Sequence, residues 1–380
     1  MRRLLTAFLA IPLFAASPAA DGLNRFAGDT YAQLARKPGN VIFSPLSIST
    51  ALSMALTGAR GKTAQEMTSV LHVPVNGELL DQLTNAGNAK GDELLLGQGL
   101  WVERAYPLLP AFVEAIQGQF HAPPTALDFS KDPDSARAAI NRWTAQKTKD
   151  KIQELFPPGS LDRSTRLVLS SAIYFNGKWQ SKFDPKQTSP APFHSQAGAT
   201  VETPFMNQTA RFAYAETPTA QVLEMPYGGG ALAFDVILPK SGTQLSTLED
   251  ALRSDGLSSW MGKLQHKRVH VALPKFRAES SFQLKDALCA MGMASAFSNA
   301  ADFSGMNGRH DLSLSQVVHK AYIDVSEEGT EAAAATGAVV ALTAFAQPVT
   351  FRADHPFLYL IRDTGSGAVL FAGRYAEPKP

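Results

Sequence analysis

Very little in this chain points to covalent crosslinking or to a polyanionic partner. The 380 residues contain one cysteine, Cys289, so no disulfide can form within the chain and stability must come from packing. Lysine and arginine number 35 against 34 aspartate and glutamate residues, which gives a net charge of +1, and we find no dense Lys/Arg face. The composition is that of an ordinary globular protein, and nucleic-acid binding is not expected.

Sequence motifs for catalysis, cofactors and metals are also missing. The chain has no G-x-S-x-G elbow, S-x-x-K pair or H-E-x-x-H zinc motif, and its eight histidines show no paired metal spacing. Cys289 lies near Leu284 and Leu288 at helical spacing, which is typical of a structural thiol rather than a nucleophile. The sequence therefore predicts no catalytic residues, no cofactor and no metal site.

Long apolar runs are absent apart from one at the N-terminus. Arg2-Arg3 precedes an apolar run that ends near Ala16, and Ser17-Pro18-Ala19-Ala20 follows it. This layout is typical of a secretory signal peptide cleaved after Ala19 or Ala20. The run is too short to span about 30 Å of hydrocarbon as a helix, so a membrane anchor is disfavoured. We expect a signal peptide at residues 1–20 and a secreted or periplasmic protein without membrane contact.

Helix signals dominate the first half of the chain and strand signals the second half. Ser44 and Pro45 begin an apolar helix that stops at Gly58, and Asp132-Pro133 begins another. Between them, Thr63-Ala64-Gln65-Glu66 has the form of a capping box. Strands are predicted at residues 167–175, 222–225, 231–238 and 268–273, with a C-terminal hairpin from 357–361 and 368–371. This order predicts an α+β fold, and no linker divides residues 21–380, so we expect a single domain.

The most informative segment follows a further predicted strand, residues 317–325. One face of that strand would carry Val317, His319, Ala321, Ile323 and Val325. About twenty residues then pass before the next clear strand, although structureless loops longer than about 12–15 residues are uncommon. The local sequence pattern predicts that the segment starting at Glu327 is either a flexible linker or a short surface helix with Thr330 as its N-cap.

A different property of this segment favours a strand. Between Thr330 and Ala341 no side chain is bulky or charged except Glu331, so the segment could enter an existing sheet. The period of two would give it a face of small side chains, formed by Thr330, Ala332, Ala334, Thr336 and Ala338.

Six segments of the chain resemble the serpin family, and the likeness extends from about Asn24 to Glu377. They are Asn40-Val41-Ile42-Phe43-Ser44-Pro45-Leu46-Ser47-Ile48, Leu169-Ser170-Ser171-Ala172-Ile173-Tyr174-Phe175-Asn176-Gly177-Lys178-Trp179, Leu273-Pro274-Lys275-Phe276, Asp302-Phe303-Ser304-Gly305-Met306, Val318-His319-Lys320-Ala321 and His355-Pro356-Phe357-Leu358. The resemblance implies a serpin-like α+β fold with three β-sheets and about nine helices. It also implies an exposed reactive-centre loop at about residues 327–350.

The resemblance further implies a metastable, monomeric inhibitor of serine proteases that acts as a covalent suicide substrate. The target protease would cleave the loop and form an acyl-enzyme, and the hinge of the loop would then insert as a new strand in the central sheet. Cysteine proteases are a second class of target in this family. The alternative is a non-inhibitory serpin acting as a binding or chaperone protein. Such members commonly carry bulky, charged or proline residues in the hinge, and apart from Glu328 and Glu331 this hinge has none.

Site residues can be carried over from the family position by position. The hinge maps to Glu328, Gly329, Thr330, Glu331, Ala332, Ala333, Ala334, Ala335 and Thr336. Gly329 would be its pivot because it lacks a Cβ, and Thr330 would be the first side chain buried on insertion. A cluster that gates the central sheet maps to Ser44, Ser47, Asn176 and His319. His319 lies on the apolar strand face, where a buried imidazole needs hydrogen-bond partners, so we expect a structural role for it.

The reactive bond is left between two alternatives. Counting forward from Gly329 at the family spacing gives Thr343-Ala344, whereas counting back from Val349-Thr350-Phe351 gives Leu342-Thr343. No Arg or Lys lies between Val339 and Pro348, which disfavours a trypsin-like target. Leu342, Thr343, Ala344 and Phe345 suit elastase-, chymotrypsin- or subtilisin-like pockets.

Overall fold

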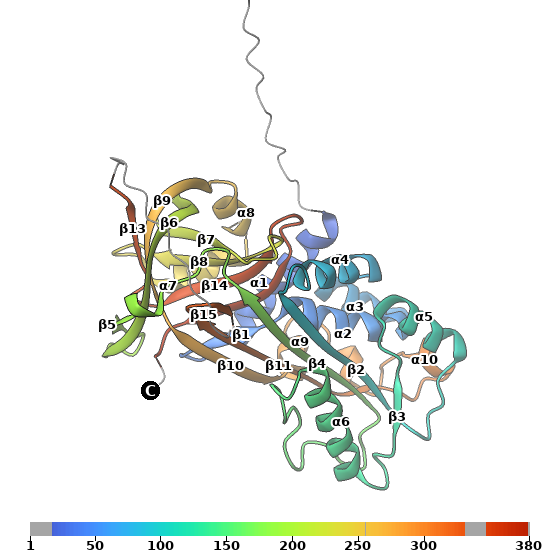
Figure 1. Cartoon of the computed structure of the whole chain (residues 1–380). Coiled ribbons are helices and arrows are strands. Elements are labelled where there is room, and N and C mark those ends of the chain that lie inside the picture. The colour runs from blue at the N-terminus through green and yellow to red at the C-terminus, as the bar shows by residue number, and fades with distance from the viewer. Residues whose placement is uncertain (1–16, 255, 331–346, 379–380) are drawn as a thin grey trace, which may run out of the picture.

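The computed structural model describes residues 17–254, 256–330 and 347–378. Ten α-helices lie within these residues (Figure 1). Their bounds are α1 Pro18–Leu34, α2 Pro45–Gly58, α3 Gly61–Leu71, α4 Gly77–Gly87, α5 Pro110–Phe120, α6 Pro133–Lys147, α7 Leu245–Leu252, α8 Gly256–Met261, α9 Lys285–Ala290 and α10 Ser304–Asn307. No helix among these described residues is both long enough and apolar enough to cross a membrane.

Fifteen strands lie in the same part of the chain. They are β1 Val41–Phe43, β2 Glu93–Glu103, β3 Thr125–Leu127, β4 Leu167–Lys178, β5 Ser189–His194, β6 Thr200–Glu216, β7 Ala220–Pro226, β8 Leu232–Pro239, β9 Gln265–Pro274, β10 Phe276–Gln283, β11 Leu314–Ser326, β12 Gly329–Thr330, β13 Val349–Arg352, β14 Phe357–Asp363 and β15 Val369–Tyr375. Each strand predicted from the sequence is present, and β14 and β15 pair as the expected antiparallel hairpin.

The strands form two hydrogen-bonded sheets. One has nine strands in the order β1-β15-β14-β8-β7-β6-β9-β13, with β5 also paired to β6. The other has six strands in the order β10-β11-β12-β4-β2-β3. The α+β class is confirmed, but the described strands pair into two sheets rather than three. The reason is β6, whose 17 residues pair with β5, β9 and β7 in turn and join these strands into one sheet.

The two sheets meet through a layer of aromatic side chains. Phe276 of β10 lies 4.4 Å from Tyr375 and 5.5 Å from Tyr359, measured between ring centroids. On the outer face of the six-stranded sheet, Trp143 of α6 packs edge-on against Trp101 of β2, with centroids 5.1 Å apart. In Figure 1, α6 lies beside β2, β3 and β4, whereas α2 to α5 gather on another side of the molecule.

Local signals for the helix starts are confirmed in two cases and wrong in one. Ser44 caps α2 by accepting a hydrogen bond from the Ser47 amide at 3.0 Å, and Asp132 caps α6 in the same way. The capping box at Thr63 and Glu66 is wrong, because α3 already begins at Gly61. The Thr63 hydroxyl instead accepts from the Asp302 amide, and the Glu66 carboxylate accepts from Ser295. Distant partners have taken both side chains that the local motif would use.

Two buried charged side chains, Arg362 and Asp235, meet the partly exposed Glu224 in the nine-stranded sheet. Arg362 of β14 donates to Asp235 of β8 at 2.8 Å and to Glu224 of β7. One cation thus faces two carboxylates, and Asp235 Oδ1 has no hydrogen-bond partner among the described residues. Burial, only partly offset by Arg362, raises the pKa of Asp235 to about 6.

This arrangement predicts a pH dependence of stability. The pKa of Asp235 is higher in the folded protein than in the unfolded chain. The stabilisation that protonated Asp235 adds to the free energy of unfolding is therefore fully present below pH 4 and is lost as pH rises through 6. Between pH 5 and 8 the loss should be roughly 1–2 kcal/mol. The Asp235→Asn variant should lack this component, so the difference between variant and wild type in urea unfolding should change with pH. Parallel pH profiles would contradict the assignment.

Candidate functional site

The six-stranded sheet is split at one end between its two central strands. Over most of their length β11 and β4 pair directly and in parallel, from Leu314 opposite Leu167 to Tyr322 opposite Tyr174. Beyond Tyr322 the two strands separate and β12 lies between them. The face of β11 expected from the sequence is buried, with Val317, His319, Ala321, Ile323 and Val325 each at most 1% exposed.

β12 consists of the first hinge residues after the turn at the end of β11. It is antiparallel to both neighbours, because Thr330 pairs with Val325 of β11 and with Gly177 of β4. The turn is held by Trp179, the residue that directly follows β4. The Trp179 amide donates a hydrogen bond to the Glu328 carbonyl at 2.8 Å. The Trp179 indole also donates to the Ser326 carbonyl at 2.8 Å. Two hinge residues are therefore already part of the sheet.

Gly329 has a conformation and a packing that only glycine allows. Its φ is +149°, outside the range that other residues readily adopt. A Cβ at this position would lie 2.0 Å from the Gly177 carbonyl oxygen and 2.6 Å from Lys178 Cα. Both obstacles are backbone atoms of β4, so the clash cannot be relieved by a side-chain rotation.

Thr330 is anchored in an aromatic cluster. Its side chain is fully buried, and its hydroxyl lies 2.6 Å from that of Tyr227. The Tyr227 ring stacks on Trp179 at a centroid distance of 4.9 Å and meets Phe175 edge-on at the same distance. From the sequence, Thr330 is predicted to be the first side chain buried on insertion. In this structure Thr330 is already buried, because β12 lies between the separated ends of β11 and β4.

Two ion pairs hold the turn before β12. Glu327 accepts from Lys275 Nζ at 2.8 Å and from the Thr188 hydroxyl at 3.0 Å. Burial would raise the pKa of Glu327, but these hydrogen bonds bring it below its ordinary value, so the carboxylate is ionised at neutral pH. The next residue, Glu328, pairs with Lys182. The hinge therefore leaves β11 through a fixed turn rather than a loose one.

His319 connects β11 to β4 and to α2 in the directly paired part of the sheet. The Ser44 amide donates to His319 Nε2 at 2.9 Å, and His319 Nδ1 lies 2.9 Å from Ser171 Oγ and 3.0 Å from the Ser171 carbonyl oxygen. The Ser171 hydroxyl lies 2.7 Å from that of Ser47, which also accepts from Gln98 Nε2 at 2.7 Å. Ser44 Oγ donates to the Leu370 carbonyl of β15. The network thus links both sheets and α2.

The hydrogen bonds fix the protonation of the imidazole. A backbone N–H can only donate, so His319 Nε2 must be an acceptor and the ring proton must lie on Nδ1. The ring is therefore neutral. Complete burial lowers the pKa of His319 to about 3, against the opposing effect of its bond to the Ser171 carbonyl. As expected from the sequence, the side chain is a buried structural histidine with its partners satisfied.

Three of the four expected cluster residues meet in this network, and Asn176 does not. Register places Ser171 opposite His319, whereas Asn176 lies five residues further along β4, opposite Glu93 of β2. The prediction of Asn176 is therefore wrong, and Ser171 and Gln98 take part in the network without having been predicted. The alternation of side chains along β4 limits the possible partners of His319 to the residues on one face of the strand. Only the pairing of β4 with β11 identifies Ser171 as the partner.

The other expected site residues lie outside the described part of the chain. They are the hinge residues Glu331, Ala332, Ala333, Ala334, Ala335 and Thr336 and the reactive-bond residues Leu342, Thr343 and Ala344. The chain is described again from residue 347, and β13 follows at once. Within the described residues no group of three or more His, Cys, Asp and Glu side chains could hold a metal ion.

Comparisons with known proteins agree with this geometry. The family model for serpins, described as serine protease inhibitors, matches residues 21–378. The chain belongs to the serpin family. A serpin-like protein of Thermococcus kodakarensis is 39% identical over 95% of this chain and 86% of its own length. The leukocyte elastase inhibitor of Bos taurus is 39% identical over 93% of this chain and 98% of its own.

Solved serpin structures confirm the fold. A highly specific serpin of the insect Tenebrio molitor superposes with a TM-score of 0.85 at 34% identity, covering 95% of this chain and 98% of its own. Uncleaved ovalbumin gives a TM-score of 0.86 at 27% identity, covering 95% of this chain and all of its own. The serpin fold is therefore shown over nearly the whole chain.

Replacing Gly329 should expel β12 from the sheet. The Gly329→Ala variant cannot place its Cβ beside Gly177, so the turn should detach and Glu328 should become accessible. Cleavage after Glu328 by a glutamyl endopeptidase, followed by mass spectrometry, should become at least about tenfold faster, as expected for a clash of about 1.4 kcal/mol or more. Gly118→Ala is the matched control, since nothing lies within 4 Å of the added methyl. Equal cleavage of both variants would contradict the packing described here.

Protonation of His319 should oppose folding at acidic pH. Its pKa is lower in the folded protein than in the unfolded chain, so its stability contribution is present above about pH 6.5 and is lost as pH falls towards 3. At pH 5.5 the loss should be about 1.4 kcal/mol. His319→Gln should lack this loss in urea unfolding. Independently, the NMR signal of the wild-type imidazole should not titrate above about pH 4. Titration near pH 6.5 would show that the ring is not buried.

Proposed function

We propose that this serpin inhibits serine endopeptidases as a covalent suicide substrate. Cleavage of its loop would free residues 331 onward to insert between β11 and β4. The observation that carries this proposal is the register of β12. Thr330 already pairs with Val325 on one side and with Gly177 on the other, antiparallel to both. Further residues can extend this strand only by entering between β11 and β4.

The two registers agree on where each inserted residue would lie. Continuing β12 puts Ala334 between Ala321 and Ile173, and Thr336 between His319 and Ser171. The direct pairing of β11 with β4 independently places Ala321 opposite Ile173 and His319 opposite Ser171. A new strand would therefore fit without a register shift. Its small side chains would extend the buried face of β11.

Insertion would exchange one parallel pairing for two antiparallel pairings. Parallel ladders are slightly less stable per residue than antiparallel ones, and the inserted strand would also bring its own hydrogen bonds. The uncleaved loop is tied at both ends, by β12 and by β13, which limits how far it can enter. Cutting the loop removes this restraint. The uncleaved protein would then be metastable, as proposed from the family resemblance.

The His319 network would act as the gate for this insertion. The bonds from His319 to Ser171 span the gap that Thr336 would have to occupy. Opening the sheet therefore requires these bonds to break. The Thr336 hydroxyl could then replace them, because it can both donate and accept. While the strands separate, the remaining polar atoms of the network would keep their hydrogen bonds to Ser44, Ser47 and Gln98.

The target class is proposed from the loop and from the relatives. Residues 339–348 carry no Arg or Lys, so an elastase-, chymotrypsin- or subtilisin-like protease is favoured over a trypsin-like one. The similar proteins include elastase inhibitors. Leu342-Thr343 and Thr343-Ala344 remain the two candidate reactive bonds. A cysteine protease is the second class of target.

Export to the periplasm or the medium is part of the same proposal. Residues 1–16 lie outside the described part of the chain, and α1 begins at Pro18 with Ser17 as its cap. Cleavage after Ala19 or Ala20 would remove this cap, whose hydroxyl accepts from the Ala20 amide at 3.2 Å. Sequencing the N-terminus of the exported protein would locate the cut. Retention of Met1 would contradict a cleaved signal peptide.

The function is tested by incubating the mature protein with elastase, chymotrypsin, subtilisin and trypsin. At least one enzyme of the first three should form an adduct that survives a denaturing gel, and mass spectrometry of the released peptide should identify the reactive bond. Loop cleavage without an adduct and without a gain in thermal stability would favour the non-inhibitory alternative.

Thr336→Arg tests the register of insertion. An unpaired guanidinium would have to enter the sheet beside His319, at a cost of several kcal/mol, so the variant should be cleaved as a substrate and form at least about tenfold less adduct. Thr336→Ser, which keeps the hydroxyl, should inhibit like wild type. Thr330→Arg should also become a substrate, but it should destabilise the uncleaved protein too, because Thr330 is already buried. Undiminished inhibition by Thr336→Arg would refute the proposed insertion.

A further inference from the structure

Basic side chains gather on one exposed sheet face of the molecule. On β9, His266, Arg268 and His270 alternate with Val269 and Val271, which are fully buried. The basic residues therefore point to the opposite, outer face. His266 and Arg268 are exposed, and His270 is partly exposed, with its Nδ1 lying 3.1 Å from the Thr209 hydroxyl of β6. This face is not visible as a cluster in the sequence, because part of it comes from another strand.

The neighbouring strand β6 adds a fourth basic residue to this face. Arg211 is exposed and lies directly opposite Arg268 in the antiparallel pairing of β6 with β9. Like charges at directly opposite positions destabilise a sheet. Among the described residues no carboxylate forms an ion pair with Arg211. On β7, the neighbour of β6 on its other side, Glu224 lies opposite Ala213, and Arg362 already binds it.

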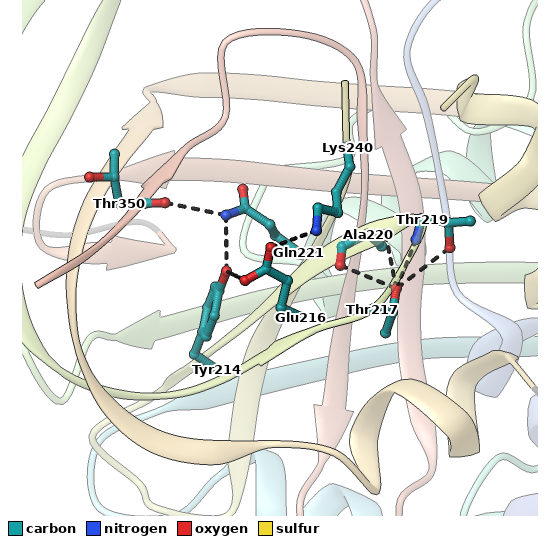
Figure 2. A network of polar contacts seen from close by, with 8 residues as sticks. All are labelled: Tyr214, Glu216, Thr217, Thr219, Ala220, Gln221, Lys240 and Thr350. Atoms are coloured by element: carbon teal, nitrogen blue, oxygen red, sulfur yellow. Dashed lines mark hydrogen bonds and ion pairs between the residues drawn. The ribbon is translucent and has the colours of Figure 1, made fainter. Parts of the chain in front are cut away.

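This basic face adjoins the strand in which the reactive loop ends. β13 pairs in parallel with β9, and Thr350 lies opposite His270. Figure 2 shows how β13 is fixed there: Gln221 of β7 donates to the Thr350 carbonyl at 3.3 Å and to the Tyr214 hydroxyl at 2.9 Å. The end of the loop is thus held against the strands that carry the basic residues.

A protease bound to the loop would reach this face. The candidate reactive bonds lie five to seven residues before β13, which an extended chain spans in at most about 25 Å. A protease of ordinary domain size has a comparable diameter. The surface of the enzyme would therefore lie over β13 and β9. Since the whole chain has a net charge of only +1, the positive potential of this face is a local feature.

We propose that Arg211, His266, Arg268 and His270 form a docking surface for an acidic region of the target protease. The proposal rests on the inhibitory function proposed above and adds a determinant of specificity that lies outside the loop. The surface steers proteases with a complementary charge to the loop and raises their rate of association. Charge complementarity of this kind acts mainly on association rates, by about 10- to 1,000-fold, and is screened by salt.

The test measures docking separately from inhibition. Subtilisin is inactivated with phenylmethylsulfonyl fluoride, and half of it is succinylated on its lysines to make its surface acidic. At about 50 mM salt, wild-type protein should associate with the succinylated enzyme at least about tenfold faster than with the unmodified enzyme, as measured by surface plasmon resonance. This preference should disappear near 1 M salt, where the Debye length is about 3 Å.

Charge reversal distinguishes this surface from general electrostatics. The double variant Arg211→Glu/Arg268→Glu should lose the preference for the succinylated enzyme. The matched control Arg104→Glu/Arg142→Glu changes two exposed arginines beside β2 and on α6, far from β9 in Figure 1, and should keep it. Equal loss in both variants, or no loss in either, would overturn the proposal. Binding of wild type to heparin but not to succinylated subtilisin would assign the face to a polyanion and would also overturn it.

The inhibitory function can fail independently of this surface. If wild-type protein forms no covalent adduct with any active protease, the suicide-substrate mechanism is wrong. The charge preference towards inactivated enzyme can still be present in that case. Conversely, normal adduct formation together with no charge preference would remove the docking surface and leave the mechanism intact.

Discussion

The pairing of β11 with β4 is the constraint on which the rest of this structure depends. These two central strands run parallel, although each could accept an antiparallel strand between them, as β12 demonstrates at one end. The two strands are therefore hydrogen-bonded to each other over most of their length, and β12 separates them at one end. The turn at Glu327 and Glu328 holds β12 between the ends of these strands, and the proposed insertion would place the small side chains of the hinge there.

The polar network at His319 shows how such a gap can be held closed. A buried imidazole, hydroxyls and one amide connect β11, β4, β2 and α2, where apolar packing alone would have been simpler. Buried polar groups are costly unless they are paired, so the network favours arrangements that satisfy every member. Among the described residues of the network, Gln98 Oε1 is the buried side-chain atom without a hydrogen-bond partner. If the sheet opens for the proposed insertion, polar groups can form new hydrogen bonds with the inserted strand, whereas separated apolar faces have no alternative partners.

Charge in this protein is organised locally although it nearly cancels overall. The buried Arg362 binds two carboxylates, and ion pairs at Lys182 and Lys275 fix the turn before β12. The basic face of β6 and β9 lies next to β13. None of these groupings is contiguous in sequence. Each arises because strands distant along the chain become neighbours in a sheet.

The sequence by itself determined the α+β class, the helix starts at Ser44 and Asp132, seven of the fifteen described strands and the small size of most hinge side chains, because these depend on local capping, alternation and side-chain size. The resemblance of six segments to serpin sequences also indicated the family. Tertiary structure alone decided that Ser171 and not Asn176 meets His319, that Thr330 is already buried and that Arg211 faces Arg268. Those outcomes depend on register between strands far apart in the chain, and register is set by how whole sheets pack.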